Sequence, residues 1–340
     1  MNVHVTIFDT FAAPELGPEC WGGVQTRGDS DVVFLTWQWQ RSWWECFGRG
    51  KLLLLAARRD GDIVALAPFF TESGMIYFVG AGGSDYLDFV GDISEPEVLD
   101  ALLGTAQRQV PDFIGFVFHH VSEQSRTGRL LDDAAGRLGL KIFDEGGWPA
   151  PALELAAQPV AARDAVNKKS LVRHERFFAR DDTLKVSHLT RSEEILPHLE
   201  GFFAQHRARW AATPYPSLFC DDAQRRFYRS LTPAAADAGW LRFTQVEWQG
   251  RSIAYHFGFC YRGSFMWYKP TFAIDLARHS PGEVLLRQLL LAAIAENASA
   301  FDFGLGDEAF KSRFATRVAH VKNWGLYDPR ALPPPSSAAS

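Results

Sequence analysis

The sequence predicts an α/β protein with mixed sheets, made of two related halves. Its 340 residues exceed the usual size of one domain, and a hydrophobic content of 47% is ample for real cores. Segments with helical apolar spacing alternate with strand-like segments along the whole chain. Each half also contains a meander of three strands followed by helix, strand, helix and strand, although no clear residue-level repeat relates the halves.

The first half begins with a strand over 3–8 and an aromatic helix over 34–47. Four large apolar side chains of this helix share one face at i, i+4 steps, and we assign them to the core because such a row is usually packing. They are Leu35, Trp39, Trp43 and Phe47. The remaining predicted elements are strands over 51–58, 63–71, 75–79, 113–118 and 141–143 and helices over 95–108 and 124–138.

A glycine-rich loop follows the third strand. Gly80, Gly82 and Gly83 make residues 80–88 too irregular for a helix or strand and allow the backbone to approach another group closely. The loop lacks the Gly-x-x-x-x-Gly-Lys-Ser/Thr spacing of a nucleotide-binding P-loop. We therefore favour a structural turn, with a phosphate-binding nest as the alternative.

Glycine and proline cluster over 146–151, which is the best candidate for a domain boundary. We accordingly predict domains over 1–150 and 151–328, and a disordered tail over 329–340 that is rich in proline, serine and alanine. After an initial basic helix, the second domain is predicted to contain a strand over 184–189, helices over 192–210 and 221–231, and strands over 240–248, 252–261, 264–270 and 318–326.

The basic helix carries Lys168, Lys169 and Arg173, spaced so that several can share one face. Acidic residues dilute this charge, so a solvated helix face is the simpler interpretation. The sharper hypothesis is that these three side chains bind a phosphate or carboxylate of a substrate through charge-assisted hydrogen bonds.

The rest of the chain is organised around a helix that begins after Ser280. Ser280 is a good N-cap, Pro281 suits the first helical position, and Glu283 completes a Ser-x-x-Glu capping box. Apolar residues then recur at helical spacing, so one broad face must be buried, most simply against a sheet. They are Val284, Leu285, Leu286, Leu289, Leu290, Ala293 and Ile294.

Polar groups gather after the next strand, predicted over 300–303, where a Gly-x-Gly turn opens another helix at Asp307. Asp302, Asp307, Glu308 and Lys311 are close together in the sequence beside an apolar run. In the simple interpretation Asp307 is an N-cap and Lys311 is its i+4 partner. The functional interpretation is a reaction site, because loops carry chemistry more often than cores do.

Composition excludes several classes of function. A net charge of −5 and a slightly acidic pI argue against the basic patch that bulk nucleic-acid binding needs. The four cysteines have no zinc-ligand spacing, so we expect a reducing compartment and no metal. The N-terminus lacks a charged leader with an apolar core, and no run is long enough to span a bilayer. We therefore expect a cytoplasmic protein.

The order of elements and two segments resemble a known family. Ser280-Pro281-Gly282, together with residues 302–308 and Lys311, look like the acetyltransferase family linked to bacterial cellulose and exopolysaccharide synthesis, often called CelD-like. The segments over 37–47 and 80–88 also fit its pattern. That family belongs to the GNAT superfamily and is related to the Fem-type transferases, which carry two GNAT-like domains. The resemblance covers most of the chain and implies tandem GNAT-like domains in a Fem-like arrangement.

The resemblance implies transfer of an acyl group, expected to be acetyl, from a CoA thioester to an amine or hydroxyl of a sugar or cell-envelope precursor. In the GNAT fold, N–H groups at a helix N-terminus hold the pyrophosphate. By position this assigns His279, Ser280, Gly282 and Glu283 to cofactor binding. Pro281 removes one donor and Glu283 adds negative charge, so an acyl carrier other than CoA is an alternative.

Acyl transfer needs a base for the attacking group and donors for the developing oxyanion. Asp302, Glu308 and His256 are the candidate catalytic bases, and Lys311 is the candidate for stabilising charge or neutralising a substrate phosphate. Asp307 is a further candidate base and is grouped with the substrate-binding residues. His256 stands in the middle of a predicted strand, so a structural histidine is the alternative.

Two other functions stay open. A Fem-like aminoacyl or peptidyl transferase acting on a cell-wall precursor would use the basic helix near Lys168. A non-catalytic protein would use the same fold as an assembly partner in a polysaccharide-synthesis complex, since fold does not determine function. The partners we expect are a small-molecule or sugar-precursor acceptor and peripheral contact with an envelope complex, but no nucleic acid.

Overall fold

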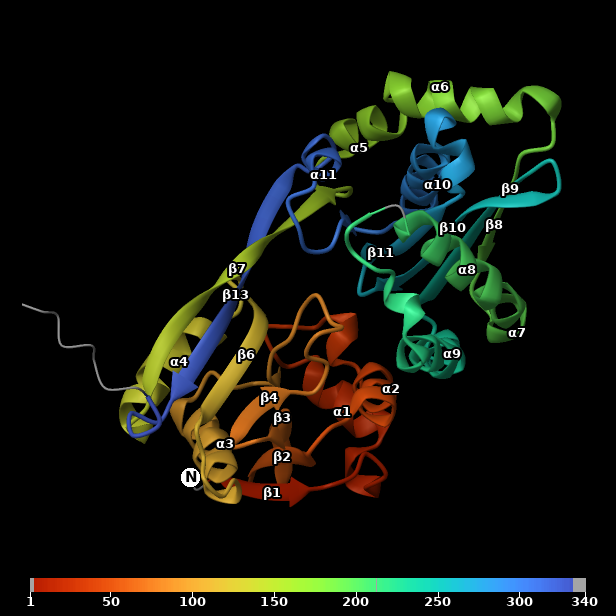
Figure 1. Cartoon of the computed structure of the whole chain (residues 1–340). Helices are drawn as coiled ribbons and strands as arrows, with labels where there is room; N and C mark the ends of the chain where they lie inside the picture. The colour runs from red at the N-terminus through yellow and green to blue at the C-terminus, as the bar shows by residue number, and fades with distance from the viewer. Residues whose placement is uncertain (1–2, 212, 333–340) are drawn as a thin grey trace, which may run out of the picture. The chain divides into compact units, whose positions relative to one another are not determined.

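The computed structural model describes residues 3–211 and 213–332, and the chain divides into two compact units. Unit 1 contains the chain up to Trp148 and again from Ala319, and unit 2 runs from Pro149 to Val318. The chain passes from one unit to the other inside two long strands, β7 (Lys141–Glu154) and β13 (Arg317–Tyr327). Figure 1 shows the elements of each unit.

The glycine and proline cluster over 146–151 is not a loop, so its interpretation as a structure breaker is wrong. It lies inside β7, where a Cβ on Gly147 would be 2.0 Å from the carbonyl oxygen of Val321 in β13. Glycine here permits close approach of two backbones, which a sequence pattern does not distinguish from a turn. In the predicted tail, residues 329–332 form a turn and a bend, and residues 333–340 lie outside the described residues.

Unit 1 is built on a mixed sheet. The antiparallel meander is β1 (His4–Phe8), β2 (Lys51–Arg59), β3 (Asp62–Glu72) and β4 (Met75–Phe78). β4 pairs in parallel with β6 (Gly115–Ser122), β6 pairs antiparallel with β13, and the short β5 (Val90–Gly91) pairs with β3. The predicted hairpin at Asp60-Gly61 is confirmed, with Arg59 opposite Asp62.

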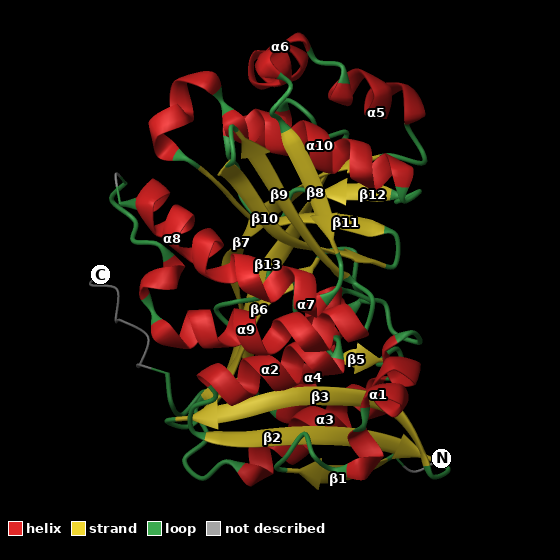
Figure 2. Cartoon of the chain, turned by 90° about the vertical axis from the view of Figure 1, so that its right-hand side faces the viewer, coloured by secondary structure: helices red, strands yellow, loops and turns green. Residues whose placement is uncertain are grey.

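Four helices belong to unit 1: α1 (Pro18–Gln25), α2 (Trp37–Phe47), α3 (Pro96–Gln109) and α4 (Thr127–Leu138) (Figure 2). Thr36 caps α2 by accepting a hydrogen bond from the N–H of Trp39 at 3.3 Å. Trp39 and Trp43 are buried, which confirms their assignment to the core. The sequence missed α1, because its Cys-Trp-Gly-Gly segment has weak helical spacing.

The glycine-rich loop over 80–88 folds onto its own unit. The N–H groups of Gly83 and Ser84 both donate to the carbonyl of Gly80, and the hydroxyl of Ser84 accepts from Trp39 Nε1 at 2.9 Å. At the end of the loop, Asp88 is buried and accepts from Ser30 and Thr127 at 2.5 and 2.6 Å. These internal contacts favour the structural turn over a phosphate-binding nest.

Unit 2 is also built on a mixed sheet. The predicted meander is confirmed as β9 (Leu241–Trp248), β10 (Arg251–Tyr261) and β11 (Ser264–Phe272), with β8 (Lys185–Leu189) antiparallel to β9. β12 (Ala300–Asp302) pairs antiparallel with β7 and in parallel with β11, but only over Ser264–Met266 of β11. β11 therefore continues for six residues, from Trp267 to Phe272, beyond its partner.

Helices pack on both faces of this sheet (Figures 1 and 2). Helix α10 (Pro281–Ala295), with α5 (Pro159–Val166) and α6 (Lys169–Phe178), shares a core with Ile253 and Ala254. On the other face, Phe202 of α8 (Leu199–Trp210) packs against Tyr255 and Phe257, and Tyr228 of α9 (Asp222–Asp237) contacts Phe257.

Two predicted helices are interrupted. The basic helix is α5 and α6, separated at Asn167 and Lys168, and the helix predicted over 192–210 is α7 (Ser192–Ile195), a 3-10 turn containing Pro197, and α8. Pro197 has no N–H to donate, which explains the second break. The final short helix is α11 (Ala309–Ser312). The 3-10 helices are Pro14–Leu16, Val33–Leu35, Ala179–Asp181, Leu196–His198, Leu218–Cys220 and Ile274–His279.

No helix within residues 3–211 and 213–332 is both long and apolar enough to cross a membrane.

Candidate functional site

The start of α10 differs from the predicted capping box. Ser280 is the N-cap, but its backbone is left-handed with φ 56°, and its side chain caps no N–H group. The N–H of Glu283 instead donates to the carbonyl of Ser280 at 3.0 Å. The capping-box prediction is therefore wrong, whereas Pro281 does occupy the first helical position as predicted. The first N–H groups of a helix have no acceptor within the helix. Since Pro281 has no N–H, the first of these donors in α10 is the N–H of Gly282.

A cavity of about 230 Å³ lies beside this helix start, within unit 2. Its walls come from β11 beyond the end of β12, from the first turns of α10, from the segment over 310–314 and from the end of α8. The lining residues used below are Arg209, Trp267, Thr271, Phe272, Gly282 and Arg313. Gly282 keeps this space open, because a Cβ on it would lie 3.0 Å from the ring of Phe272.

The negative charge of Glu283 is already balanced by protein groups. One carboxylate oxygen of Glu283 lies 2.9 Å from His174 Nδ1, and the other lies 3.4 Å from Arg313 Nη1. Arg313 also donates to the hydroxyl of Ser170 at 3.2 Å. Glu283 is therefore paired with a residue of α6 and with the residue just after α11. These partners offset its negative charge, so Glu283 repels an anion at the helix start less than we expected from the sequence.

Ser280, Gly282 and Glu283, three of the four predicted cofactor-binding residues, line the cavity. The fourth, His279, stacks on Phe177 with ring centroids 3.9 Å apart and accepts from Arg278 at 2.9 Å. Burial and the nearby positive groups lower the pKa of His279. His279 is thus fixed against α6 and is not among the lining residues.

The predicted catalytic residues of the segment over 302–311 are held by local bonds. Asp302 accepts from the N–H of Gly304 at 2.8 Å. Lys311 is buried and donates to the carbonyl of Leu305 at 2.6 Å and to Glu308 at 2.7 Å. Glu308, rather than Asp307, precedes α11 as its N-cap and pairs with Lys311, while Asp307 is exposed. The buried ammonium of Lys311 therefore holds together the loop over 305–308.

His256 is completely buried in β10. Its Nε2 accepts from the N–H of Tyr268 at 3.2 Å, while Nδ1 has no partner among the described residues. Burial lowers the pKa of His256 to about 3, so the ring is neutral near pH 7. The ring stacks on Trp267, with centroids 5.7 Å apart, and Trp267 lines the cavity. His256 thus lies behind the cavity wall.

The three predicted substrate-binding cations have different surroundings in the structure. Lys168, which precedes α6, places its ammonium 5.3 Å from the ring centroid of Phe314, another residue lining the cavity. Arg173 contacts His174 Nε2 at 3.2 Å, next to the His174–Glu283 pair. Lys169 is exposed on the first turn of α6. Of these three cations, only Lys168 therefore has a contact with a lining residue among those described here.

Sequence reasoning missed Arg209, Trp267, Thr271 and Arg313 as site residues. Arg209 donates to the carbonyl of Pro270 at 3.0 Å, and its guanidinium lies 4.3 Å from the ring centroid of Phe272. The contact joins residues 61 positions apart in the sequence, so no local pattern indicates it. The one available signal was Thr271, a hydroxyl residue directly after a proline near the end of a predicted strand.

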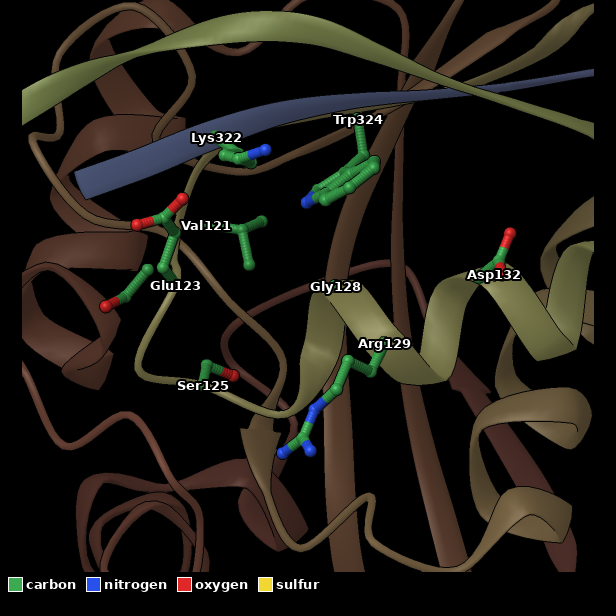
Figure 3. A pocket seen from close by; sticks show the side chains of 9 residues that line it. Val121, Glu123, Ser125, Gly128, Arg129, Asp132, Lys322 and Trp324 are labelled. Atoms are coloured by element: carbon green, nitrogen blue, oxygen red, sulfur yellow. The ribbon is translucent and has the colours of Figure 1, made fainter.

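Unit 1 has a larger cavity, of about 480 Å³, between the end of β6, α4 and β13 (Figure 3). Trp324 of β13 points toward α4, where Gly128 makes room for it: a Cβ there would lie 3.1 Å from the indole. Arg129 and Asp132 line the α4 side, and Lys322 is already paired with Asp144 at 2.6 Å. None of the predicted site residues lines this cavity.

One known protein family matches part of the chain in sequence. The sequence pattern of the family described as "Acetyltransferase (GNAT) domain" matches residues 166–312, which lie in unit 2 and include the helix start and most of the cavity. A search of curated protein sequences finds no match. Residues 166–312 of unit 2 are thus similar to a GNAT-type acetyltransferase domain.

Solved structures extend the likeness to both units. FemX is 11% identical with a TM-score of 0.67 and covers 91% of this chain and 95% of its own. L-PGS from Bacillus licheniformis is 14% identical with a TM-score of 0.57, covering 93% and 94%. A tandem GNAT protein from the clavulanic acid biosynthesis pathway is 10% identical with a TM-score of 0.52, covering 97% and 100%. The chain therefore has the two-domain GNAT-like fold.

Proposed function

We propose that the protein is an acyltransferase that moves an acyl group, expected to be acetyl, from a CoA thioester to an amine or hydroxyl of a sugar or cell-envelope precursor. The observation that carries this proposal is the cavity at the start of α10, inside the region that matches the acetyltransferase domain. Exopolysaccharide or envelope synthesis, a cytoplasmic location and peripheral contact with an envelope complex belong to the same proposal, which the CelD-like motifs around Ser280 and Asp302 support.

The donor would lie along β11 and against the start of α10. β11 extends beyond its partner β12, so β12 does not cover the edge of β11 over 267–272, where a bound chain could lie. The N–H of Gly282 and the helix dipole favour an anionic group at this end of the cavity. The pairing of Glu283 with His174 and Arg313 lowers the electrostatic cost of an anion there.

For the chemical step, a base must take the proton of the attacking amine or hydroxyl. Asp302 is our preferred base, because it ends β12 opposite Met266, where β11 and β12 stop pairing. Glu308 is engaged with Lys311, and His256 is buried and neutral. We expect Asp302→Asn to lower turnover by about 100-fold or more, within the range of general-base catalysis. Glu308→Gln and His256→Gln should retain most activity, and a larger loss for either would overturn this choice.

A Fem-like aminoacyl or peptidyl transferase is the second candidate. The likeness in fold to FemX over most of both chains favours it, as does Pro281, which removes one N–H donor from the helix start. In that case Lys168, Lys169, Arg173 and Asp307 would bind the acceptor, with Lys168 next to Phe314 as the nearest group. Loss of acceptor binding without loss of donor binding in a Lys168→Met variant would support this assignment.

The first experiment measures the thermal midpoint with and without excess acetyl-CoA, because a ligand that binds only the native state raises it by mass action. We expect a clear increase for the wild type and none for Gly282→Phe, whose side chain would fill the cavity. The control is Gly136→Phe on an exposed turn of α4, where a new Cβ meets nothing within 4 Å. No increase for the wild type would favour another acyl carrier or a non-catalytic role.

A further inference from the structure

Arg209 is a partly buried cation that no carboxylate of the described residues neutralises. It lines the cavity of unit 2 at the end of α8, and burial lowers its pKa. Its described contacts are one hydrogen bond to the carbonyl of Pro270 and stacking on the rings of Phe272 and Trp210. Within residues 3–211 and 213–332 it makes no ion pair. A guanidinium has five N–H donors, so most of its donors are left for another group.

Two other arginines of unit 2 with little exposure are each paired with a glutamate. The side chain of Arg287 is 16% exposed and pairs with Glu175, and that of Arg242 is 19% exposed and pairs with Glu296. Removing a cation from water is costly unless an anion or several hydrogen bonds compensate. Arg209 therefore differs from these arginines in needing a partner that the described protein does not supply.

Thr271 is a second, independent polar group at the same cavity without a partner. It lines the cavity, is completely buried, and its hydroxyl makes no hydrogen bond with any described residue. A buried hydroxyl without a partner costs about 1–3 kcal/mol. Pro270, the neighbour of Thr271 in β11, accepts from Arg209, so the guanidinium lies beside the part of β11 that carries the hydroxyl. Such groups are expected where a ligand completes the hydrogen bonding.

The surrounding charge is positive. Burial, with Lys269 and Arg209, lowers the pKa of His206 to about 3. Arg209, Thr271 and Gly282 all line one cavity, and they offer a guanidinium, a hydroxyl and a backbone N–H at the helix start. Glu283 also lines the cavity, but its carboxylate is paired with His174 and Arg313. The remaining groups are a donor set for an anion.

We propose that Arg209 and Thr271 form a subsite for an anionic group, a carboxylate or a phosphate, belonging to one of the two substrates. The proposal deepens the acyltransferase assignment and rests on it only for the identity of the cavity as the reaction site. The guanidinium provides paired N–H donors that match either anion, and the Thr271 hydroxyl supplies a further donor. An anion here would contribute to specificity, since a neutral analogue would leave the Arg209 charge without a counter-ion and the buried Thr271 hydroxyl without an acceptor.

The test uses inorganic phosphate as the probe, at constant ionic strength set with chloride. Thermal midpoints are measured for the wild type, Arg209→Met and Thr271→Val, with Arg207→Met on the exposed side of the same helix as the matched control. Phosphate should raise the midpoint of the wild type and of Arg207→Met. We expect binding to be about 10- to 100-fold weaker in Arg209→Met, as for loss of a charge-assisted hydrogen bond, and less affected in Thr271→Val.

The same titration with acetyl-CoA present identifies the source of the anion. If acetyl-CoA abolishes the phosphate effect, the subsite holds a phosphate of the donor, and acetyl-pantetheine should then leave the effect intact. If the two effects add, the subsite holds an anion of the acceptor. Equal phosphate effects in the wild type, Arg209→Met and Thr271→Val would overturn the proposal.

The two proposals fail in different ways. Phosphate could raise the thermal midpoint in a way that depends on Arg209 while acetyl-CoA has no effect. That result would support the anion subsite and contradict CoA as the donor. An acetyl-CoA effect without a phosphate effect that depends on Arg209 would keep the donor site and reject the subsite. Arg209→Lys is the second variant: it retains the charge, so it should keep part of the phosphate effect if Arg209→Met folds poorly.

Discussion

The two units share an order of elements but differ in what fills the space after the meander. In unit 1, the loop over 80–88 is closed by its own hydrogen bonds, with Ser84 bound to Trp39 and Asp88 buried among hydroxyl donors. In unit 2, a cavity remains after β11, and the hydroxyl of Thr271 at its wall has no partner among the described residues. Gln40 Oε1 of unit 1 is also buried without a described partner, so the informative feature is such a group at the wall of a cavity, as for Thr271.

The helix that follows each meander shows the same contrast. Pro96 begins α3 and Pro281 begins α10, and both helices carry a glutamate in their first turn. In unit 1, the first-turn glutamate is Glu97, which is exposed, and the N-cap Glu95 pairs with Arg59. In unit 2, Glu283 pairs with His174 and Arg313 next to the cavity. The same local signal thus marks a plain helix start in one unit and a candidate binding site in the other.

Acid should have the largest effect, and it should act on unit 2 first. Burial lowers the pKa of both His206 and His256 to about 3. Between pH 6.5, the ordinary value for the unfolded chain, and about pH 3, only the unfolded state gains these protons, so stability is lost as pH falls through this window. Near pH 5 the free energy of unfolding should be lower by about 2 kcal/mol per histidine. Hydrogen exchange at neutral and mildly acidic pH measures this unit by unit.

Unit 1 is the comparison for this prediction, because it contains groups of both signs: burial lowers the pKa of His119, as in unit 2, but acts in the opposite sense on an acid. Burial raises the pKa of Asp88, so protonation of Asp88 favours the folded state of unit 1 as pH falls. The sign is opposite to that of the two histidines. Equal loss of protection in both units near pH 5 would contradict the comparison, as would an unchanged pH response after His206→Asn.

Asp88→Ala should have the next largest effect, confined to unit 1. The change removes the acceptor of Ser30, Thr127 and the N–H of Phe89. Leaving buried donors without an acceptor should lower the free energy of unfolding by about 3 kcal/mol in urea titrations. Acetyl-CoA should still raise the midpoint. A loss below about 1 kcal/mol, or loss of the acetyl-CoA effect, would show that this loop is not a filled structural turn. Asp9→Ala is the exposed control.

Lys311→Met should weaken unit 2 by about 2 kcal/mol, because it removes the buried bond that closes the loop over 305–308. The expected result includes weaker donor binding, since Phe310 and Arg313 on either side of Lys311 line the cavity. Urea unfolding and the acetyl-CoA shift measure the two effects. If Lys311→Met is less stable but binds acetyl-CoA normally, the loop over 305–308 does not shape the cavity and the prediction is wrong.

Glu308→Gln should have the smallest effect. Glu308 is the other partner of Lys311, but its side chain is 57% exposed, so solvent screens the ion pair. We expect a change below about 0.5 kcal/mol, measured by the same urea titration. A loss as large as that of Lys311→Met would show that the ion pair, and not the bond to Leu305, closes the loop.

Much of the fold was predictable from short patterns. The meanders, their Asp60-Gly61 and Gln249-Gly250 turns, and the helix after Pro281 all follow from contacts within a few residues. The predictions from sequence were wrong where one residue type occurs in two kinds of structure, such as glycine in turns and in closely packed strands. Gly146 and Gly147 lie inside a strand, and Ser280 adopts a left-handed backbone and caps nothing with its side chain.

The candidate site was predictable only in part. Ser280, Gly282 and Glu283 line the cavity because they begin α10, which a capping-type signal marks in the sequence. The partners of Glu283 come from α6 and from the segment after α11, which no spacing in the sequence brings together. His256 was open to either interpretation, and its burial behind Trp267 is a tertiary property.

The sequence by itself determined that this chain is two mixed α/β halves with a helix beginning at Pro281, because hydrophobic spacing and proline geometry act locally. The tertiary structure alone decided that Arg209 of α8 lies against Phe272 of β11 and that Thr271 faces the same cavity. The physical reason is that burial and hydrogen-bond satisfaction depend on which distant segments pack together, and a linear pattern does not contain that information.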